Sequence, residues 1–116
     1  MPKFIVVGSY SSGSWARLIR SMDDRIALVR SFAEALGGSL ECIYWEASTR
    51  TVYAIADLPD SATAVAATAV LSKTGAFKDV ESHELLTQEQ LSDVLALAGD
   101  VAQVYHVPGE SGDTPT

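Results

Sequence analysis

The spacing of apolar and polar positions divides the chain into short strands and helices. Residues 3–10, 39–46, 51–57 and 77–86 are rich in β-branched, aromatic and alternating apolar types, which predicts four strands. The connection at 47–50 lacks the Asn-Gly or Asp-Gly pair of the tightest hairpins, so we expect a looser loop between the second and third strands.

A helical pattern lies between the first two predicted strands. Apolar residues recur at one-, three- and four-residue steps from Trp15 to Leu36, as they do on one face of an amphipathic helix. This pattern predicts a helix that is either continuous or broken near Asp23-Asp24. Gly37-Gly38 supplies the left-handed residue that ends it.

Two further helices are predicted from their capping residues. Asp60 or Ser61 begins an alanine-rich helix, whose small side chains permit close approach to a sheet. Thr87 and Gln90 have the spacing of a capping box, which predicts a short third helix after the fourth strand. The residues expected to face inward on this third helix are Leu91, Val94, Leu95 and Ala98.

The order of these elements predicts the fold class. Strand, helix, strand, strand, helix, strand is the ferredoxin-like βαββαβ plan of an α+β protein, with an antiparallel sheet, helices on one face and an additional C-terminal helix. Several positions on the other sheet face are apolar or aromatic, so something must cover that face. In a chain this short the commonest cover is a second copy, and we therefore expect a homo-oligomer through the sheet face.

The length and the end of the chain predict its domain organisation. The 116 residues suit one domain, which we place at 1–107. Residues 101–107 alternate weakly, as an edge strand or an arm laid on a partner would. Residues 108–116 are rich in Gly, Pro, Ser and Thr, which predicts a disordered tail.

Charge and composition exclude several classes of partner. The formal net charge is −7, from eight Lys and Arg against fifteen Asp and Glu, so neither nucleic acid nor an anionic membrane surface is an expected partner. No apolar run approaches the roughly 20 residues that cross a bilayer. The one cysteine, Cys42, rules out an internal disulfide and suits a reducing cytoplasm, which is the expected location.

Several short motifs, in order and at matching spacing, resemble those of the GYD-domain family. The resemblance covers roughly residues 3–100. It implies a ferredoxin-like fold of the dimeric α/β-barrel type, as found in a family of bacterial proteins. The motifs that carry it are Gly8-Ser9-Tyr10, Leu36-Gly37-Gly38, Asp57-Leu58-Pro59-Asp60 and Leu85-Leu86-Thr87-Gln88-Glu89-Gln90.

The chain departs from the family between the second and third strands. Family members carry Gly, an acid, Tyr and Asp there, and the matching positions here are Ser48, Thr49, Arg50 and Thr51. Hydroxyls and a guanidinium have replaced two carboxylates and a phenol. An acid–base role of the family motif therefore does not carry over to this chain.

Catalytic candidates are few. His83 in the fourth strand and Tyr44 in the second are the candidates for moving protons, although a surface or interface histidine is the commoner finding. Cys42 has the surroundings of a small buried hydrophobe rather than of a nucleophile. His83 and His106 are far apart and no Cys-x-x-Cys spacing occurs, so we expect no metal site.

Aromatic and charged residues of the predicted strands suggest a ligand site. Tyr10, Trp45 and Tyr53 come from three strands and suit either a flat apolar ligand or ordinary packing at an interface. Glu46 and Arg50 bracket the altered loop, where they either pair with each other or hold an anionic group.

Three functions of different class are consistent with the sequence. The preferred one is a ligand-binding or non-catalytic assembly module, because no cofactor fingerprint, phosphate loop or triad pattern occurs and no cofactor is expected. The second is a cofactor-free isomerase or oxygenase acting on an aromatic or enolisable small molecule. The third is a subunit that binds a different protein through its acidic surface.

Overall fold

A computed structural model of the chain describes residues 1–109 as two compact units, Met1–Leu85 and a second unit that begins at Leu86. The single domain expected over 1–107 stays a prediction. The tail predicted for 108–116 lies outside the described residues from position 110 onward. None of the helices within residues 1–109 has the length and hydropathy needed to cross a membrane.

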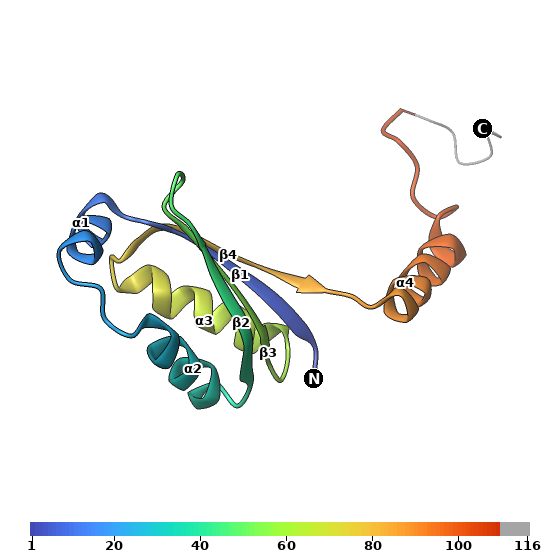
Figure 1. Cartoon of the computed structure of the whole chain (residues 1–116). Helices are drawn as coiled ribbons and strands as arrows, with labels where there is room; N and C mark the ends of the chain where they lie inside the picture. The colour runs from blue at the N-terminus through green and yellow to red at the C-terminus, as the bar shows by residue number, and fades with distance from the viewer. Residues whose placement is uncertain (110–116) are drawn as a thin grey trace. The chain divides into compact units, whose positions relative to one another are not determined.

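A four-stranded antiparallel sheet forms the centre of the first unit (Figure 1). Its strands are β1 (Lys3–Tyr10), β2 (Ser39–Glu46), β3 (Thr51–Asp57) and β4 (Phe77–Leu85). They lie in the order β2-β3-β1-β4, so the first and third strands are central and the second and fourth are the edges. This order confirms the predicted α+β ferredoxin-like fold.

The long helical pattern after β1 forms two helices, α1 (Ser12–Arg20) and α2 (Arg25–Ala35). The prediction of one continuous helix was therefore wrong, and the alternative with a break near Asp23-Asp24 is confirmed. Ser21 ends α1 in an extended conformation with φ of −159°. Asp24 then caps α2, because its carboxylate accepts a hydrogen bond of 3.0 Å from the backbone N–H of Ala27.

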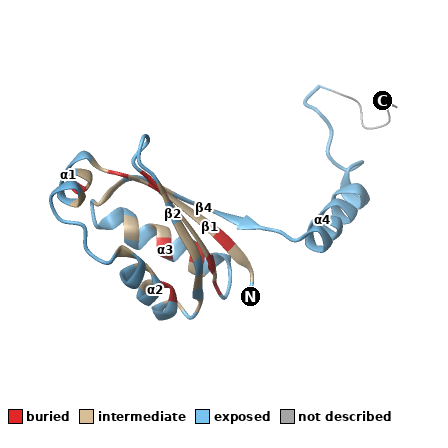
Figure 2. Ribbon diagram, viewed as in Figure 1, coloured by how far each residue is buried: buried red, intermediate tan, exposed pale blue. Residues whose placement is uncertain are grey.

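The alanine-rich helix α3 (Ser61–Lys73) begins after the cap at Asp60, as predicted. Together α2 and α3 lie on one face of the sheet (Figure 1). The best-buried cluster between these layers joins Phe4, Ala56, Leu58 and Ala64. Figure 2 shows that the buried residues of the layers are few and scattered over β1, β3, α2 and α3.

The second unit contains α4 (Gln88–Val101). The predicted capping box is present, since Thr87 accepts from the Gln90 backbone and the Gln90 side chain accepts from the Thr87 N–H. None of the residues of α4 is buried in the part of the chain that the structure describes, so the positions predicted to face inward on it (Leu91, Val94, Leu95 and Ala98) are exposed. The edge strand predicted as one alternative for residues 101–107 was wrong, because α4 continues to Val101 and residues 102–104 form a turn.

The strand register assigns each side chain to one face of the sheet, because successive residues of a strand point to opposite sides. Gly8 pairs with Val52 and with Val80, and all three face the helices. Ile5 pairs with Ile55 and with His83, which places these on the opposite face. We call this opposite side the open face, because no helix of Met1–Leu85 lies on it (Figure 1).

Candidate functional site

The centre of the open face is apolar. Ile5 lies opposite Ile55 on the central strands, and Val7 lies opposite Tyr53. The side chains of Ile5, Val7 and Ile55 are half-buried. On the edge strand β2, Tyr44 lies opposite Tyr53 and is 70% exposed. The open face therefore presents an aliphatic centre that continues into a pair of tyrosines.

Charged groups lie next to this apolar centre, at one end of the strands. Lys3 forms ion pairs with Glu41 and with Asp57, the latter at 3.1 Å between Nζ and Oδ1. The hydrogen bonds to Glu41 and then to Asp57 raise the pKa of Lys3 above its ordinary value of 10.5. Glu41 reaches Lys3 because the β2–β3 register shifts between Leu40 and Cys42.

The two catalytic candidates lie on opposite edges of the open face. His83 on β4 is bonded to Glu81, with 3.1 Å between Nε2 and Oε2, and both side chains are 57% exposed. Tyr44 lies on β2, which is separated from β4 by three strand-to-strand spacings in the sheet. At about 4.8 Å per strand this separation is roughly 14 Å, so the two residues do not form one acid–base site within a single chain.

The four aromatic residues singled out in the sequence divide between the two faces. Tyr44 and Tyr53 lie on the open face. Tyr10 and Trp45 lie on the helix side, where Trp45 Nε1 donates to the Tyr10 hydroxyl at 3.3 Å. Tyr10 also packs on Phe77, with ring centroids 4.8 Å apart. The aromatic residues therefore form two pairs rather than one wall.

A network of hydroxyls and a carboxylate occupies the altered loop between β2 and β3. The Thr49 hydroxyl donates to Glu46 at 2.6 Å and lies 2.9 Å from the hydroxyl of the buried Thr51. Tyr53 also donates to Glu46, at 3.4 Å. Desolvation, together with the Glu46 charge, raises the pKa of Tyr53 above its ordinary value of 10.0.

Arg50 takes part in the loop through its backbone. Its φ of 56° is left-handed, and its carbonyl accepts from the Tyr10 N–H at 2.9 Å. No ion pair joins its guanidinium to Glu46, although both residues are described. The Glu46 carboxylate therefore accepts hydrogen bonds from the Thr49 and Tyr53 hydroxyls, and Arg50 is exposed.

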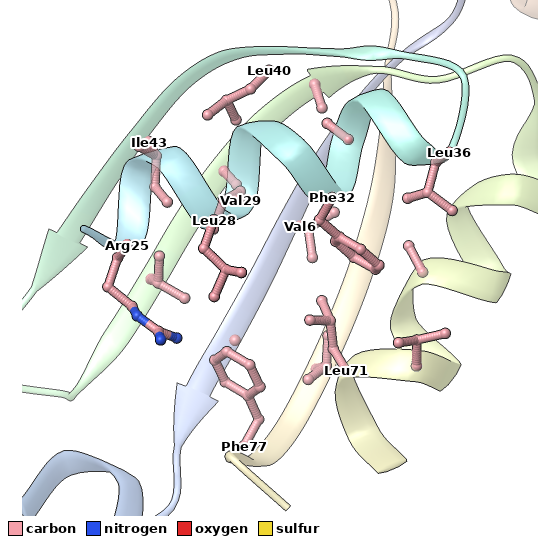
Figure 3. Close-up of a pocket in the computed structure, with 18 of the residues that line it drawn as sticks. Val6, Arg25, Leu28, Val29, Phe32, Leu36, Leu40, Ile43, Leu71 and Phe77 are labelled. Carbon is pink, nitrogen blue, oxygen red and sulfur yellow. The ribbon is translucent and has the colours of Figure 1, made fainter. Parts of the chain in front are cut away.

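A cavity that the sequence did not predict lies on the helix side of the sheet (Figure 3). Its volume is about 250 Å³, and α2, α3 and the sheet form its walls. Side chains such as Phe32, Leu71 and Phe77 point into it (Figure 3). Its only charged lining residue among those described is Arg25, at the start of α2.

The cavity exists because the sheet beneath it carries small side chains. Ala54 and Ala56 on β3 face the helices, and Ala67 on α3 faces the sheet. At Gly8 the Phe77 ring takes the place of a side chain, since a Cβ there would lie 2.8 Å from that ring. Alanine side chains are too short to fill the space between the central strands and two helices packed over them, so volume stays empty. The alternate alanines on one face of β3, at the positions opposite Val6 and Phe4, were the sequence signal that could have indicated the cavity.

Cys42 and the histidines do not assemble with acids into a larger cluster. Cys42 is half-buried on the open face, opposite Ile55. Within residues 1–109, no three His, Cys, Asp or Glu side chains gather as a metal ion would require.

Comparison with protein-family models gives a match over most of the chain. The family model described as the GYD domain matches residues 4–95. No curated protein and no solved structure matches the chain. The match covers every strand of the sheet, α1 to α3 and the first half of α4.

Proposed function

The chain belongs to the GYD-domain family, and from this premise we propose that it is a self-associating, non-catalytic binding module. In this proposal the open face of one copy packs on the open face of a second copy. A twofold pair is the simplest arrangement, since each copy then uses the same surface. The proposed partner is thus the chain itself.

The observation that carries the proposal is the apolar centre of the open face with charged groups at its edge. Ile5, Val7 and Ile55 form the centre, and the ion pairs of Lys3 lie at one end. An apolar core within a polar rim is the usual anatomy of a protein interface. Tyrosines next to the core, here Tyr53, are favoured in interfaces because they combine a large apolar ring with a hydrogen-bonding group.

A charge placed at the centre of the open face tests the proposal. Val7→Lys would place an ammonium in the interface opposite Glu81 on β4. Removing this charge pair from water costs more than the attraction within the pair returns, so we expect the variant to sediment as a monomer where the wild type sediments as a dimer. Val65→Lys is the matched control, because Val65 is 63% exposed on α3 and does not line the cavity. This control should sediment as the wild type does.

Two results of the sedimentation velocity experiment count against the proposal. One is a wild type that stays monomeric up to submillimolar concentration, which would favour a different protein as the partner. The other is a Val7→Lys variant that remains dimeric while circular dichroism shows it folded, because the interface would then lie elsewhere.

A cofactor-free enzyme is the second candidate, and the His83–Glu81 pair favours it. A carboxylate that orients a histidine is a common arrangement in acid–base catalysis. The pair lies on the open face, so a second copy packed there would exclude water from it. Tyr44 would have to act from the opposite edge strand or from the partner copy.

Native mass spectrometry of protein purified from its host separates the two candidates. A homo-oligomer with a reproducible small additional mass would support turnover or storage of a small molecule on the open face, provided that His83→Gln loses the adduct. A homo-oligomer without an adduct would support the assembly module.

A further inference from the structure

The cavity on the helix side has a second, more polar hollow next to it, which the proposed interface does not use. This second hollow has a volume of about 290 Å³ and lies beside α1 and the start of α2. Tyr10 and Arg25 line both spaces, so the apolar cavity and the polar hollow adjoin at these two residues. We call the polar hollow the vestibule.

The vestibule carries a net positive charge. Its charged lining residues are Arg17, Arg25 and Asp23, which sum to +1. Asp23 engages two nitrogens of Arg25, with 2.6 Å to Nε and 2.7 Å to Nη2, and Nη1 has no partner within residues 1–109. Arg17 donates to the Oγ of the buried Ser14 at 3.2 Å. Two guanidiniums, each hydrogen-bonded to a neighbouring side chain, therefore line a hollow in a chain whose formal net charge is −7.

The apolar cavity is large enough for one aromatic ring with a short side chain. An enclosed cavity of about 150 Å³ lined by aliphatic and aromatic side chains binds benzene. The space here is partly open, because Leu28 and Val70 in its walls are 52% and 48% exposed. The cavity here has about 250 Å³, and its walls are apolar apart from Arg25, Tyr10 and Thr74. The additional volume suits a chain of a few carbons that leads from the ring toward Arg25.

We propose that the cavity and the vestibule together form a binding site for a small aryl-substituted monocarboxylic acid. The ring lies between α2, α3 and the central strands, and the carboxylate lies in the vestibule at Arg25 and Arg17. Asp23 occupies the Nε–Nη2 edge of Arg25, so the ligand carboxylate accepts from the other edge, formed by Nη1 and the second hydrogen of Nη2. A single negative charge matches the net charge of +1 in the vestibule, whereas the acidic protein as a whole repels more highly charged anions.

Calorimetric titration with phenylpropionate tests this site, with phenylpropanol as the uncharged probe of the same shape. The wild type should bind phenylpropionate saturably at one site per chain and should bind phenylpropanol more weakly. Arg25→Gln should weaken phenylpropionate binding about tenfold, because a charge-assisted hydrogen bond is lost, and should leave phenylpropanol binding within about twofold. Retained phenylpropanol binding also shows that the variant is folded.

Matched controls separate the site from general effects of charge. Arg30→Gln removes the same charge from α2 at a position that lines neither space, so it should bind both probes as the wild type does. Ala54→Leu fills the cavity from β3 and should abolish binding of both probes. If Ala54→Leu does not fold, the smaller Ala54→Val takes its place and should weaken both probes.

Three results would overturn the proposal: no saturable binding of phenylpropionate by the wild type, equal loss in Arg25→Gln and Arg30→Gln, or unchanged binding in a folded Ala54 variant. The site lies on the side of the sheet opposite the open face. The binding experiment and the sedimentation experiment therefore fail independently.

Discussion

At the scale of single residues, the hydrogen bond between Trp45 and Tyr10 connects β2 to the end of β1. The Tyr10 side chain is buried, at 5% exposure, and its hydroxyl accepts from Trp45 Nε1. Tyr10→Phe keeps the ring and its contact with Phe77 but leaves the indole N–H without this acceptor. We expect the free energy of unfolding to fall by about 1 kcal/mol, measured by urea unfolding followed through tryptophan fluorescence.

Tyr44→Phe is the matched control for this change. Tyr44 is exposed on the open face, and its hydroxyl has no hydrogen-bond partner within residues 1–109. Loss of that hydroxyl should leave the unfolding free energy of the monomer within about 0.5 kcal/mol. Equal losses in the two variants would contradict the assigned role of the Trp45–Tyr10 hydrogen bond.

The sequence predicted the face of some candidate residues but not their contacts. Alternation along a strand was enough to separate Tyr44 from Trp45. It gave no information on the pairing of Trp45 with Tyr10, because that contact depends on the order β2-β3-β1 in the sheet. Likewise, no sequence pattern indicated that Glu46 would bind Thr49 rather than Arg50.

At the scale of secondary structure, Gly38 permits the close approach of β2 to the end of β3. A Cβ atom at this position would lie 1.9 Å from the carbonyl oxygen of Asp57. Gly38→Ala therefore requires the backbone to move, and we expect the free energy of unfolding to fall by about 3 kcal/mol. Chemical denaturation followed by circular dichroism measures this loss.

Gly99→Ala serves as the control for Gly38→Ala. A Cβ at Gly99 in α4 would meet nothing within 4 Å, and alanine favours helix there by about 1 kcal/mol. This variant should be as stable as the wild type or more stable. A Gly38→Ala protein with wild-type stability would show that the turn between α2 and β2 adapts at little cost.

Asp60 makes the start of α3 sensitive to acid. Hydrogen bonds from the Thr63 hydroxyl and then from the Thr63 backbone lower the pKa of Asp60 below its ordinary value of 3.8. Because the folded-state pKa is depressed, this stabilisation is fully present above pH 3.8 and is lost as the pH falls through the folded-state value.

Asp60→Asn isolates this contribution, since asparagine caps helices about as well as aspartate and does not titrate. We expect equal thermal midpoints for the variant and the wild type at pH 7, and a smaller decrease for the variant between pH 4 and pH 2. Parallel decreases in both proteins would contradict the role assigned to the Asp60 carboxylate.

Most helices and strands followed from the sequence, and the exceptions have local causes. The three strands at 3–10, 39–46 and 51–57 agree with the structure at both ends. The sequence did not decide whether the helix breaks before α2, because the apolar periodicity continues past Asp24. The break is visible only in the structure, where Asp24 caps the start of α2. The cavity was missed because periodicity identifies which residues face inward but not the volume that they leave empty.

At the scale of the whole molecule, the net charge of −7 opposes the proposed self-association. Two like-charged copies repel each other less when salt shortens the Debye length, from about 30 Å at 0.01 M to about 8 Å at 0.15 M. We therefore expect the dissociation constant of the dimer to decrease when sodium chloride is raised over this range, as measured by sedimentation. An increase would mean that ion pairs between the copies dominate over their net repulsion.

The sequence predicted an uncovered sheet face but did not determine what covers it. The element order and the GYD-domain membership both lead to helices on one side of the sheet. The identity of the cover depends on surface complementarity between separate chains, which alternation within one chain does not encode.

Sedimentation equilibrium of the unmodified chain tests the central claim, self-association through the open face, most directly. We predict a monomer–dimer equilibrium whose dimer dominates at high micromolar concentration in about 0.15 M salt, where the Debye length is about 8 Å. A single species with the mass of one chain, 12.3 kDa, over the whole concentration range would contradict it.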